Sequence, residues 1–324
     1  MVIRVADSIS VLRNNVHKKR IHRDSLFFVV ENYYLAIVFV SLPEMNFVSL
    51  CQFSNRLSMK KRILILIVFS QLVTQIFAIN PFRFAFITDL HIQMENASPK
   101  QDLENVILDI NQQHNIDFVL VGGDITEFGD EPSLEKAKAL LSSLKMPFYI
   151  VPGNHDQKLT APAYDFFNSV FGDNKFSFSH KGIHIVGFAT RPAKVGGNGI
   201  VTQEDIAWVE KELSALPDSV RIITVTHYPL QTGDVDNWRD MVDVLKKYEV
   251  LTVLGGHYHR NVLFAYDGIP GIINRSTLKN SENRCGYSIY TVSDSLNVAE
   301  KQLGNAEIHL LSLPFVKEET TATE

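Results

Sequence analysis

The chain has 324 residues, 45% of them hydrophobic, which is enough for one large domain or two modest ones and excludes disorder as the bulk state. The formal net charge is −5, but residues 1–78 hold ten Lys/Arg and four Asp/Glu, whereas the remainder holds 21 basic and 32 acidic side chains. This acidic remainder disfavours a nucleic-acid polymer as partner, because affinity for the phosphate backbone comes from clustered Lys and Arg.

Residues 59–78 have the composition of a secretory signal. The basic stretch Met59–Arg62 is followed by the apolar run Ile63–Phe69 and, before the composition changes, by the small residue Ala78. Because a signal normally begins a protein, we interpret residues 1–58 as an upstream extension from a mis-assigned start, and we expect export to a periplasmic or extracellular location. The alternative is a genuine tail with an uncleaved signal anchor in the membrane. This alternative stays open because Ile76, three positions before the expected cleavage site, is bulkier than the small residue that is usual there.

From residue 82 onward, buried strands alternate with amphipathic helices. Continuous apolar runs predict strands over residues 84–88, 118–121, 148–151, 220–225 and 250–254. Apolar residues at helical spacing predict helices over residues 100–114, 133–144, 163–171, 202–216 and 238–248. Ser133 is expected to open the second helix, and Thr202 is expected to cap the fourth.

Other segments have a different period. Two β-like segments, residues 175–179 and 183–190, lead into a glycine-rich loop at Val195–Gly199. Beyond residue 260 the pattern predicts β-hairpins, with strands over residues 261–266, 271–274, 287–293 and 296–301. Residues 316–324 are expected to form a flexible tail.

The five strands of the first group each end in carboxylate, amide or imidazole side chains. These residues are Asp89 and His91, Asp124, Asn154 and His155, His227, and His257 and His259. In a mostly parallel α/β sheet, ligands bind beyond the carboxyl ends of the strands, so we expect these side chains to converge. A buried cluster of this kind is costly through desolvation and carboxylate repulsion, and bound divalent cations relieve both. Mixed nitrogen and oxygen ligands suit two ions of the manganese, iron or zinc kind better than magnesium or calcium.

The order of these motifs resembles the calcineurin-like metallophosphoesterase superfamily. The resemblance covers residues 82 to about 275 and rests on Asp89-Leu90-His91, Gly123-Asp124, Gly153-Asn154-His155-Asp156, His227 and Gly256-His257-Tyr258-His259. It implies a four-layer αββα sandwich with a C-terminal β-hairpin region, which we assign to residues 79–315. The Gly-Asn-His-Asp version resembles the group that includes class III cyclic nucleotide phosphodiesterases and related exported bacterial phosphohydrolases.

Two subfamilies are disfavoured by departures from their patterns. Purple acid phosphatases have a tyrosine ligand three residues after the bridging aspartate, where this chain has Glu127. Phosphoprotein phosphatases continue Gly-Asp with Val-Asp-Arg-Gly, whereas this chain continues with Ile125–Phe128.

Carried over residue by residue, the resemblance implies two metal sites. Asp89, His91 and His259 would hold one ion, Asn154, His227 and His257 would hold the other, and Asp124 would bridge them. A metal-bridging hydroxide would then attack the phosphorus of a small phosphorylated substrate in line with the departing oxygen.

Residues next to the predicted ligands are assigned roles from their positions in the motifs. His155 would stabilise the transition state or protonate the leaving group, and its neighbour Asp156 is a candidate to fix the His155 tautomer. Tyr228 and Arg260 are candidates for substrate contacts, although Arg260 fits a solvated surface residue equally well.

The sequence leaves the substrate and one alternative function open. Phosphodiester and phosphomonoester hydrolysis share this metal site, and specificity depends on loops such as Val195–Gly199. The alternative is a binding or scaffold protein with this fold and no catalysis. The enzyme is favoured because no ligand of the pattern is missing. The oligomeric state is not indicated.

Overall fold

The structure, a computed structural model, describes residues 28–31, 34–37, 80–157, 164–192, 197–281 and 283–315. The chain divides into two compact units, Met1–Ala78 and Ile79–Glu324. In the first unit, β1 (Phe28–Glu31) and β2 (Tyr34–Ile37) pair antiparallel. The predicted signal and C-terminal tail lie outside the described residues, as does the predicted extension apart from these two strands. Within the described ranges, no helix is long and apolar enough to cross a membrane.

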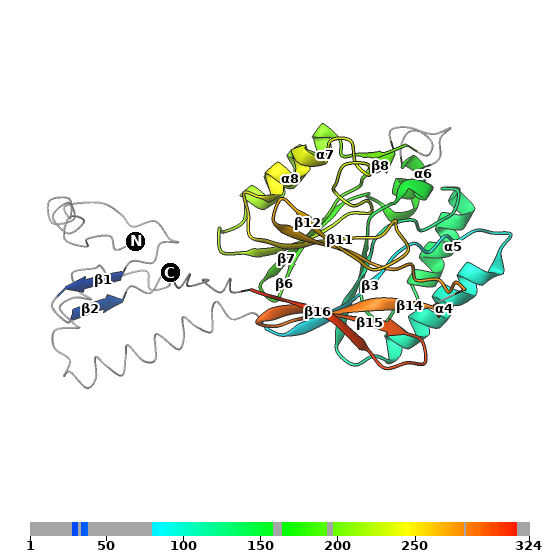
Figure 1. The fold of residues 1–324 in the computed structure, drawn as a ribbon, viewed down its shortest axis with the longest axis horizontal. Helices are drawn as coiled ribbons and strands as arrows, with labels where there is room; N and C mark the ends of the chain where they lie inside the picture. The colour runs from blue at the N-terminus through cyan, green and yellow to red at the C-terminus, as the bar shows by residue number, and fades with distance from the viewer. Residues whose placement is uncertain are drawn as a thin grey trace, which may run out of the picture. The chain divides into compact units, whose positions relative to one another are not determined.

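Two mixed six-stranded sheets form the centre of the second unit (Figure 1). In spatial order, the first sheet contains β16 (Ile308–Pro314), β15 (Ser295–Gln302), β14 (Gly286–Val292), β3 (Phe82–Ile87), β4 (Ile116–Val121) and β5 (Phe148–Ile150). The second contains β12 (Val262–Tyr266), β13 (Ile269–Ile273), β11 (Val250–Gly255), β10 (Arg221–Val225), β7 (Ile183–Gly187) and β6 (Phe176–His180). Strands β3 to β5 are parallel to one another, as are β7, β10, β11 and β13. A short pair, β8 (Arg191–Pro192) and β9 (Gly199–Ile200), lies outside both sheets.

This arrangement corrects one expectation. The strands that end in the motif residues do not share one mostly parallel sheet, because β3, β4 and β5 belong to the first sheet and β10 and β11 to the second. The C-terminal strands pair as antiparallel hairpins, as predicted. Strands β12 and β13 extend the second sheet beside β11, and β14 to β16 extend the first sheet beside β3. The C-terminal third of the chain thus adds two strands beside β11 in the second sheet and three beside β3 in the first.

Side-chain alternation along β3 shows how the layers form. Phe84 and Phe86 join a buried cluster with residues of both sheets, including Ile223 and Leu254, so this cluster is the core between the sheets. Ala85 and Ile87 belong to a different cluster, which includes residues of the helices. Because successive side chains of a strand point to opposite faces, one continuous apolar run serves both layers.

Helices cover the outer face of each sheet, on two sides of the domain (Figure 1). Helices α4 (Ala97–Gln112), α5 (Glu131–Leu141) and α6 (Asp165–Phe171) pack against the first sheet. Helices α7 (Gln203–Ser214) and α8 (Trp238–Leu245) pack against the second. The four-layer αββα sandwich is therefore confirmed.

The sequence predicted the first residues of helices α7 and α5, and the structure agrees with the prediction for α7 and differs from it for α5. Thr202 caps α7 as predicted, because its Oγ1 accepts a 3.0 Å hydrogen bond from the backbone nitrogen of Asp205. Helix α5 begins earlier than predicted. Asp130 is its N-cap, and its carboxylate accepts a 3.0 Å hydrogen bond from the backbone nitrogen of Ser133.

Candidate metal centre

Backbone hydrogen bonds join the loops that follow β3 and β4. The backbone nitrogen of Asp89 donates to the carbonyl of Gly123 at 2.9 Å. Those of Leu90 and His91 both donate to the carbonyl of Asp124, at 2.7 and 3.0 Å. Two segments separated by a whole helix are thus held side by side, with Asp89, His91 and Asp124 at one point of the sheet edge.

Three further loops are tied to the same point. In the second sheet, the backbone nitrogen of Gly256 donates to the carbonyl of His227 at 3.0 Å. The backbone nitrogen of His257 reaches across to both carboxylate oxygens of Asp89, at 3.1 and 3.2 Å. After β5, the backbone nitrogen of His155 donates to Asp124 Oδ1 at 2.9 Å. The carboxyl ends of strands from both sheets therefore converge.

The backbone is strained where these side chains are presented. Left-handed φ angles occur at Asp89 (55°), His91 (45°), Asp124 (49°), His257 (74°) and His259 (55°). Non-glycine residues seldom adopt this region, and such strain concentrates at functional sites where the surrounding structure enforces it.

Two motif glycines allow the aspartates to approach the neighbouring loops closely. A Cβ atom at Gly153 would lie 2.2 Å from Asp124 Oδ1, and one at Gly256 would lie 2.5 Å from Asp89 Oδ2. Any side chain at either position would displace a carboxylate. The glycines of the Gly-Asn-His-Asp and Gly-His-Tyr-His motifs are therefore required by packing around the site.

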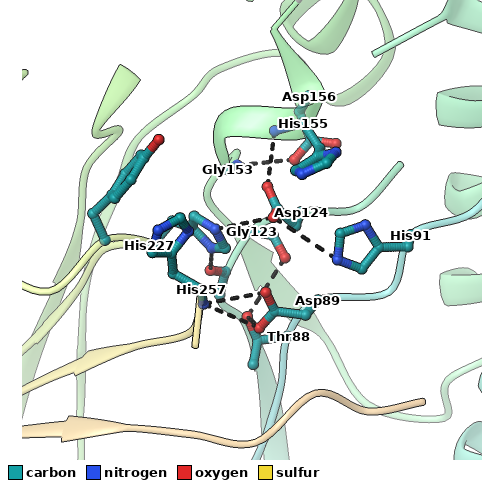
Figure 2. Close-up of polar contacts among 12 residues, drawn as sticks. Thr88, Asp89, His91, Gly123, Asp124, Gly153, His155, Asp156, His227 and His257 are labelled. Carbon is teal, nitrogen blue, oxygen red and sulfur yellow. Dashed lines mark hydrogen bonds and ion pairs between the residues drawn. The ribbon is translucent and has the colours of Figure 1, made fainter. Parts of the chain in front are cut away.

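The side chains form two groups with one shared member. Asp89, His91, Asp124 and His259 can place one nitrogen or oxygen atom each within 4.8 Å of one another, and so can Asp124, His227 and His257. Figure 2 shows Asp124 between His91 on one side and His227 and His257 on the other. This division is the one that the family resemblance implied for two metal ions sharing Asp124. Metal binding by these residues stays a prediction.

In the first group, polar atoms face one another at short range. His259 Nε2 lies 3.2 Å from Asp89 Oδ1 and 3.1 Å from His91 Nε2. The Asp89 carboxylate, which is fully buried, also accepts a 2.9 Å hydrogen bond from Thr88 Oγ1. Two imidazole nitrogens and a carboxylate oxygen pointing into one space are the donor atoms that a transition metal requires.

In the second group, His227 is held in one orientation. Its Nδ1 lies 2.8 Å from the carbonyl oxygen of Gly122, which can only accept, so Nδ1 carries the hydrogen. Its Nε2 lies 3.2 Å from Asp124 Oδ2. Burial by itself would lower the pKa of His227, but the carboxylates of Asp124 and Asp89 and the carbonyl of Gly122 together outweigh burial and raise the pKa to about 9. A positive charge is thus favoured at this position beside Asp124.

The buried groups fit metal ions. Burial would raise the pKa of Asp124, yet His227 and its other histidine neighbours hold it below its ordinary value, so this 2% exposed side chain is an anion. The side-chain oxygen of Asn154 is buried without a hydrogen-bond partner. Such an atom is costly unless a ligand satisfies it. A buried anion, directed imidazole nitrogens and an unsatisfied amide oxygen together form a suitable donor set for two cations.

Comparison with known proteins agrees with this geometry. Residues 82–261 match the family model described as calcineurin-like phosphoesterase. The chain belongs to this family. Among its relatives, a protein named probable glycerophosphodiester phosphodiesterase from Arcobacter nitrofigilis is 32% identical over 54% of this chain and 70% of its own length. A 3′,5′-cyclic-nucleotide phosphodiesterase from a Nostoc species is 24% identical over 56% of this chain and 72% of its own length.

A solved structure supports the fold. The purple acid phosphatase PPD1 from yellow lupin superposes with a TM-score of 0.51 at 12% identity, covering 72% of this chain and 53% of that protein. At this identity the likeness concerns the sandwich alone. The chain is a metal-dependent phosphoesterase by its family, and the two residue groups are its candidate metal sites.

The role expected for Asp156 in this phosphoesterase is corrected. The carboxylate is buried and accepts hydrogen bonds from the backbone nitrogens of Gly153, Ile125 and Thr126, at 2.8, 3.0 and 2.8 Å. Nδ1 of His155 instead lies 2.9 Å from the carbonyl oxygen of Glu127. Asp156 therefore ties the loop after β4 to the loop after β5, and the tautomer of His155 is set by a backbone carbonyl.

The two expected substrate contacts have different surroundings. Tyr228 is only 4% exposed, and its ring packs against the His257 ring with centroids 4.2 Å apart. It packs against a candidate ligand, and its role in contacting substrate stays a prediction. Arg260 is exposed, with its guanidinium 5.9 Å from the centroid of the Tyr258 ring. Its role in binding substrate stays a prediction.

One residue at the site was missed by the sequence reasoning. The side-chain oxygen Oε2 of Glu127 lies 2.9 Å from His91 Nδ1. The main-chain carbonyl oxygen of Glu127 contacts His155 Nδ1. In the sequence, position 127 was compared only with the tyrosine ligand of purple acid phosphatases. A carboxylate three residues after the bridging aspartate was the available signal.

Proposed function

We propose that this chain is a phosphodiesterase that requires two divalent metal ions of the manganese, iron or zinc kind and hydrolyses small phosphodiesters. The observation that carries the proposal is the position of Asp124. Its carboxylate belongs to both groups of potential ligands, so two ions held by these groups would share it. Paired cations at such a site neutralise phosphate charge and activate a water molecule.

The residues of the chain would divide the work. The seven predicted ligands, Asp89, His91, Asp124, Asn154, His227, His257 and His259, hold the ions and thereby place the substrate phosphate. His155 has an accessible side chain, and its Nδ1 hydrogen points to the Glu127 carbonyl, so its Nε2 is available to substrate. In its protonated form, His155 would stabilise the phosphate oxygens and give its Nε2 proton to the departing oxygen.

The names of the relatives favour diesters over monoesters. Two relatives of this chain are named for hydrolysing glycerophosphodiesters and 3′,5′-cyclic nucleotides, and both of these are phosphodiesters. These substrates differ in the groups attached to phosphorus, so the proposal covers the diester bond and leaves the attached groups to experiment.

A substrate panel tests the proposal. Manganese-supplemented protein is assayed with bis(p-nitrophenyl) phosphate, p-nitrophenyl phosphate, 3′,5′-cyclic AMP and glycerophosphocholine, with Asp124→Asn prepared in parallel to reveal contaminating phosphatases. We expect kcat/KM for at least one diester to exceed that for the monoester by about tenfold, a difference of ~1.4 kcal/mol. Faster monoester hydrolysis would contradict the diesterase assignment, and no turnover of any substrate would favour the catalytically silent alternative.

We also propose that the enzyme works outside the cytoplasm, after cleavage or as a membrane-anchored form. Support comes from the basic and apolar pattern of residues 59–78 and from the start of the second compact unit at Ile79. N-terminal sequencing of the protein from fractionated cells tests this. A mature start near Ile79 in the exported fraction supports cleavage, whereas a cytoplasmic protein with intact residues 59–78 would contradict export.

A further inference from the structure

Glu127 contacts two site histidines with different atoms. Its carboxylate oxygen Oε2 lies 2.9 Å from His91 Nδ1, and its main-chain carbonyl oxygen lies 2.9 Å from His155 Nδ1. The two imidazole rings are neighbours, with centroids 4.9 Å apart and planes at 81°. One residue therefore touches both a predicted metal ligand and the predicted proton donor.

The carboxylate contact determines which nitrogen of His91 can bind a metal. This contact is an ion pair outside hydrogen-bond geometry, but a carboxylate oxygen at 2.9 Å repels a lone pair, so a hydrogen on His91 Nδ1 is favoured. The lone pair of the neutral ring is then on Nε2, which is the atom that faces His259 Nε2 at 3.1 Å. A carboxylate on the far nitrogen of a metal-binding histidine fixes the ring orientation and strengthens the nitrogen as a ligand.

The segment that carries Glu127 is held firmly. The backbone nitrogen of Glu127 donates to the carbonyl of Ile92 at 3.1 Å. The preceding residue, Thr126, donates to the buried Asp156 carboxylate through its backbone nitrogen at 2.8 Å and through Oγ1 at 3.0 Å. The Glu127 carbonyl and carboxylate are thus fixed relative to His91 and His155.

We propose that Glu127 is a positioning residue for this site, whose carboxylate orients His91 toward the metal while its carbonyl orients His155 toward the substrate. The proposal rests on the proposed function, because it assumes that His91 binds a catalytic ion. Glu127 itself touches neither the ion nor the substrate in this account.

A third metal ion is the competing explanation. His91, Glu127 and His155 can place one ligand atom each within 4.8 Å of one another. Such an ion would need a lone pair on His155 Nδ1, the nitrogen that faces Glu127. The hydrogen bond from His155 Nδ1 to the Glu127 carbonyl places a hydrogen on that atom. This hydrogen bond favours positioning over a third site, and metal stoichiometry separates the two.

The two contacts of Glu127 can be separated by mutation. Substitutions of the side chain remove the carboxylate contact with His91 and a longer one, 3.8 Å, with His155 Nδ1, and they leave the main-chain carbonyl beside His155. Glu127→Ala removes the acceptor, whereas Glu127→Gln retains an oxygen that can accept from His91 Nδ1. Glu95→Ala is the matched control, because Glu95 is exposed, four residues from His91, and carries the same charge.

The test titrates metal-stripped protein with manganese by calorimetry and follows diester turnover against free manganese. We expect Glu127→Ala to bind one of two ions about 10–100-fold more weakly, Glu127→Gln to lose less, and Glu95→Ala to match the wild type. Saturating manganese should restore most of kcat in Glu127→Ala. The melting temperature of the stripped protein should change little in all three variants.

Several results would overturn the inference. Wild-type manganese affinity in Glu127→Ala, or equal losses in Glu127→Ala and Glu127→Gln, would exclude orientation of His91 by the side-chain oxygen of Glu127. Three ions in the wild type and two in Glu127→Ala would make Glu127 a ligand. A lowered melting temperature of stripped Glu127→Ala with unchanged affinity would assign it to folding. If the wild type binds no manganese, the proposed function itself fails, which is a distinct result.

Discussion

His91 and His259 are 168 residues apart in the sequence, yet their Nε2 atoms lie 3.1 Å apart where the strand ends of the two sheets converge. Two neutral imidazoles at this distance can share one hydrogen, and without it their lone pairs repel. A cation between them, together with Asp89, would satisfy both nitrogens. The neighbouring histidine of the same motif, His257, belongs to the other group, with Asp124 and His227.

We therefore predict that His257→Ala and His259→Ala each weaken a different metal site. Each variant should bind about one ion per chain at limiting manganese, measured by elemental analysis after gel filtration, because a transition-metal site with one imidazole fewer binds less tightly. Combining His259→Ala with His91→Ala should remove no further ion, whereas combining it with His227→Ala should remove both. The exposed His309 provides a control, His309→Ala. Loss of the same ion in both single variants would refute the division.

Asp124→Asn should abolish turnover while preserving the fold. The amide keeps the shape and can still accept from the backbone nitrogen of His155, but it removes the anion common to both groups. Loss of several kcal/mol of metal-supported stabilisation lowers kcat by about a thousandfold. Diester turnover at saturating manganese and circular dichroism measure the two effects. Wild-type kcat with both metals bound would refute the bridging role.

Acid should destabilise the fold through His184, away from the metal centre. His184 is 5% exposed between the hydroxyls of Ser177 and Ser179, at 3.0 and 2.9 Å. Burial lowers its pKa below 6.5, although Glu212 opposes this. The unfolded chain therefore takes up the proton first, so stability falls as pH drops below 6.5 until the folded-state pKa is reached.

Urea unfolding of metal-stripped protein at about pH 7.5 and pH 5.5 measures this effect. The wild type should lose more unfolding free energy between the two pH values than His184→Gln, which has no titrating group at this position. Stripping the metals removes the contribution from protonation of their ligands. Equal losses in the two proteins would show that His184 does not contribute.

Local sequence patterns predicted most elements and could not predict how strands pair. The run Phe84–Thr88 indicated a buried strand, and β3 occupies Phe82–Ile87. Two sheets were expected from the resemblance, but the sheet to which each strand belongs was not predicted, because every buried parallel strand has the same apolar pattern whichever sheet contains it. Strand β16 was missed although its sequence, with Ile308, Leu310, Leu311 and Leu313, is largely apolar, because His309 and the adjacent Leu310 and Leu311 break a regular alternation.

The candidate site followed from motif order more than from spacing. Short motifs at the ends of five strands placed the seven predicted ligands, since the carboxyl ends of parallel strands meet at one edge. Sequence proximity failed for Asp156, which is next to His155 in the chain but binds backbone nitrogens of the neighbouring loop. It also overlooked Glu127, whose contact with His91 depends on how the loops after β3 and β4 lie together.

Metal removal should abolish activity reversibly. Exhaustive chelation should leave no diester turnover, because the proposed ions would activate the attacking water, and manganese should restore it. Calcium should restore little, since it prefers oxygen ligands. Turnover that survives chelation and gains nothing from manganese would contradict metal dependence.

Titration of stripped wild-type protein with manganese, followed by diester turnover, tests the two-metal site most directly. Because Asp124 is shared by both groups, the account predicts that turnover rises until two equivalents are bound and stays low at one. Full turnover at a single equivalent, or continued binding without any turnover, would contradict it.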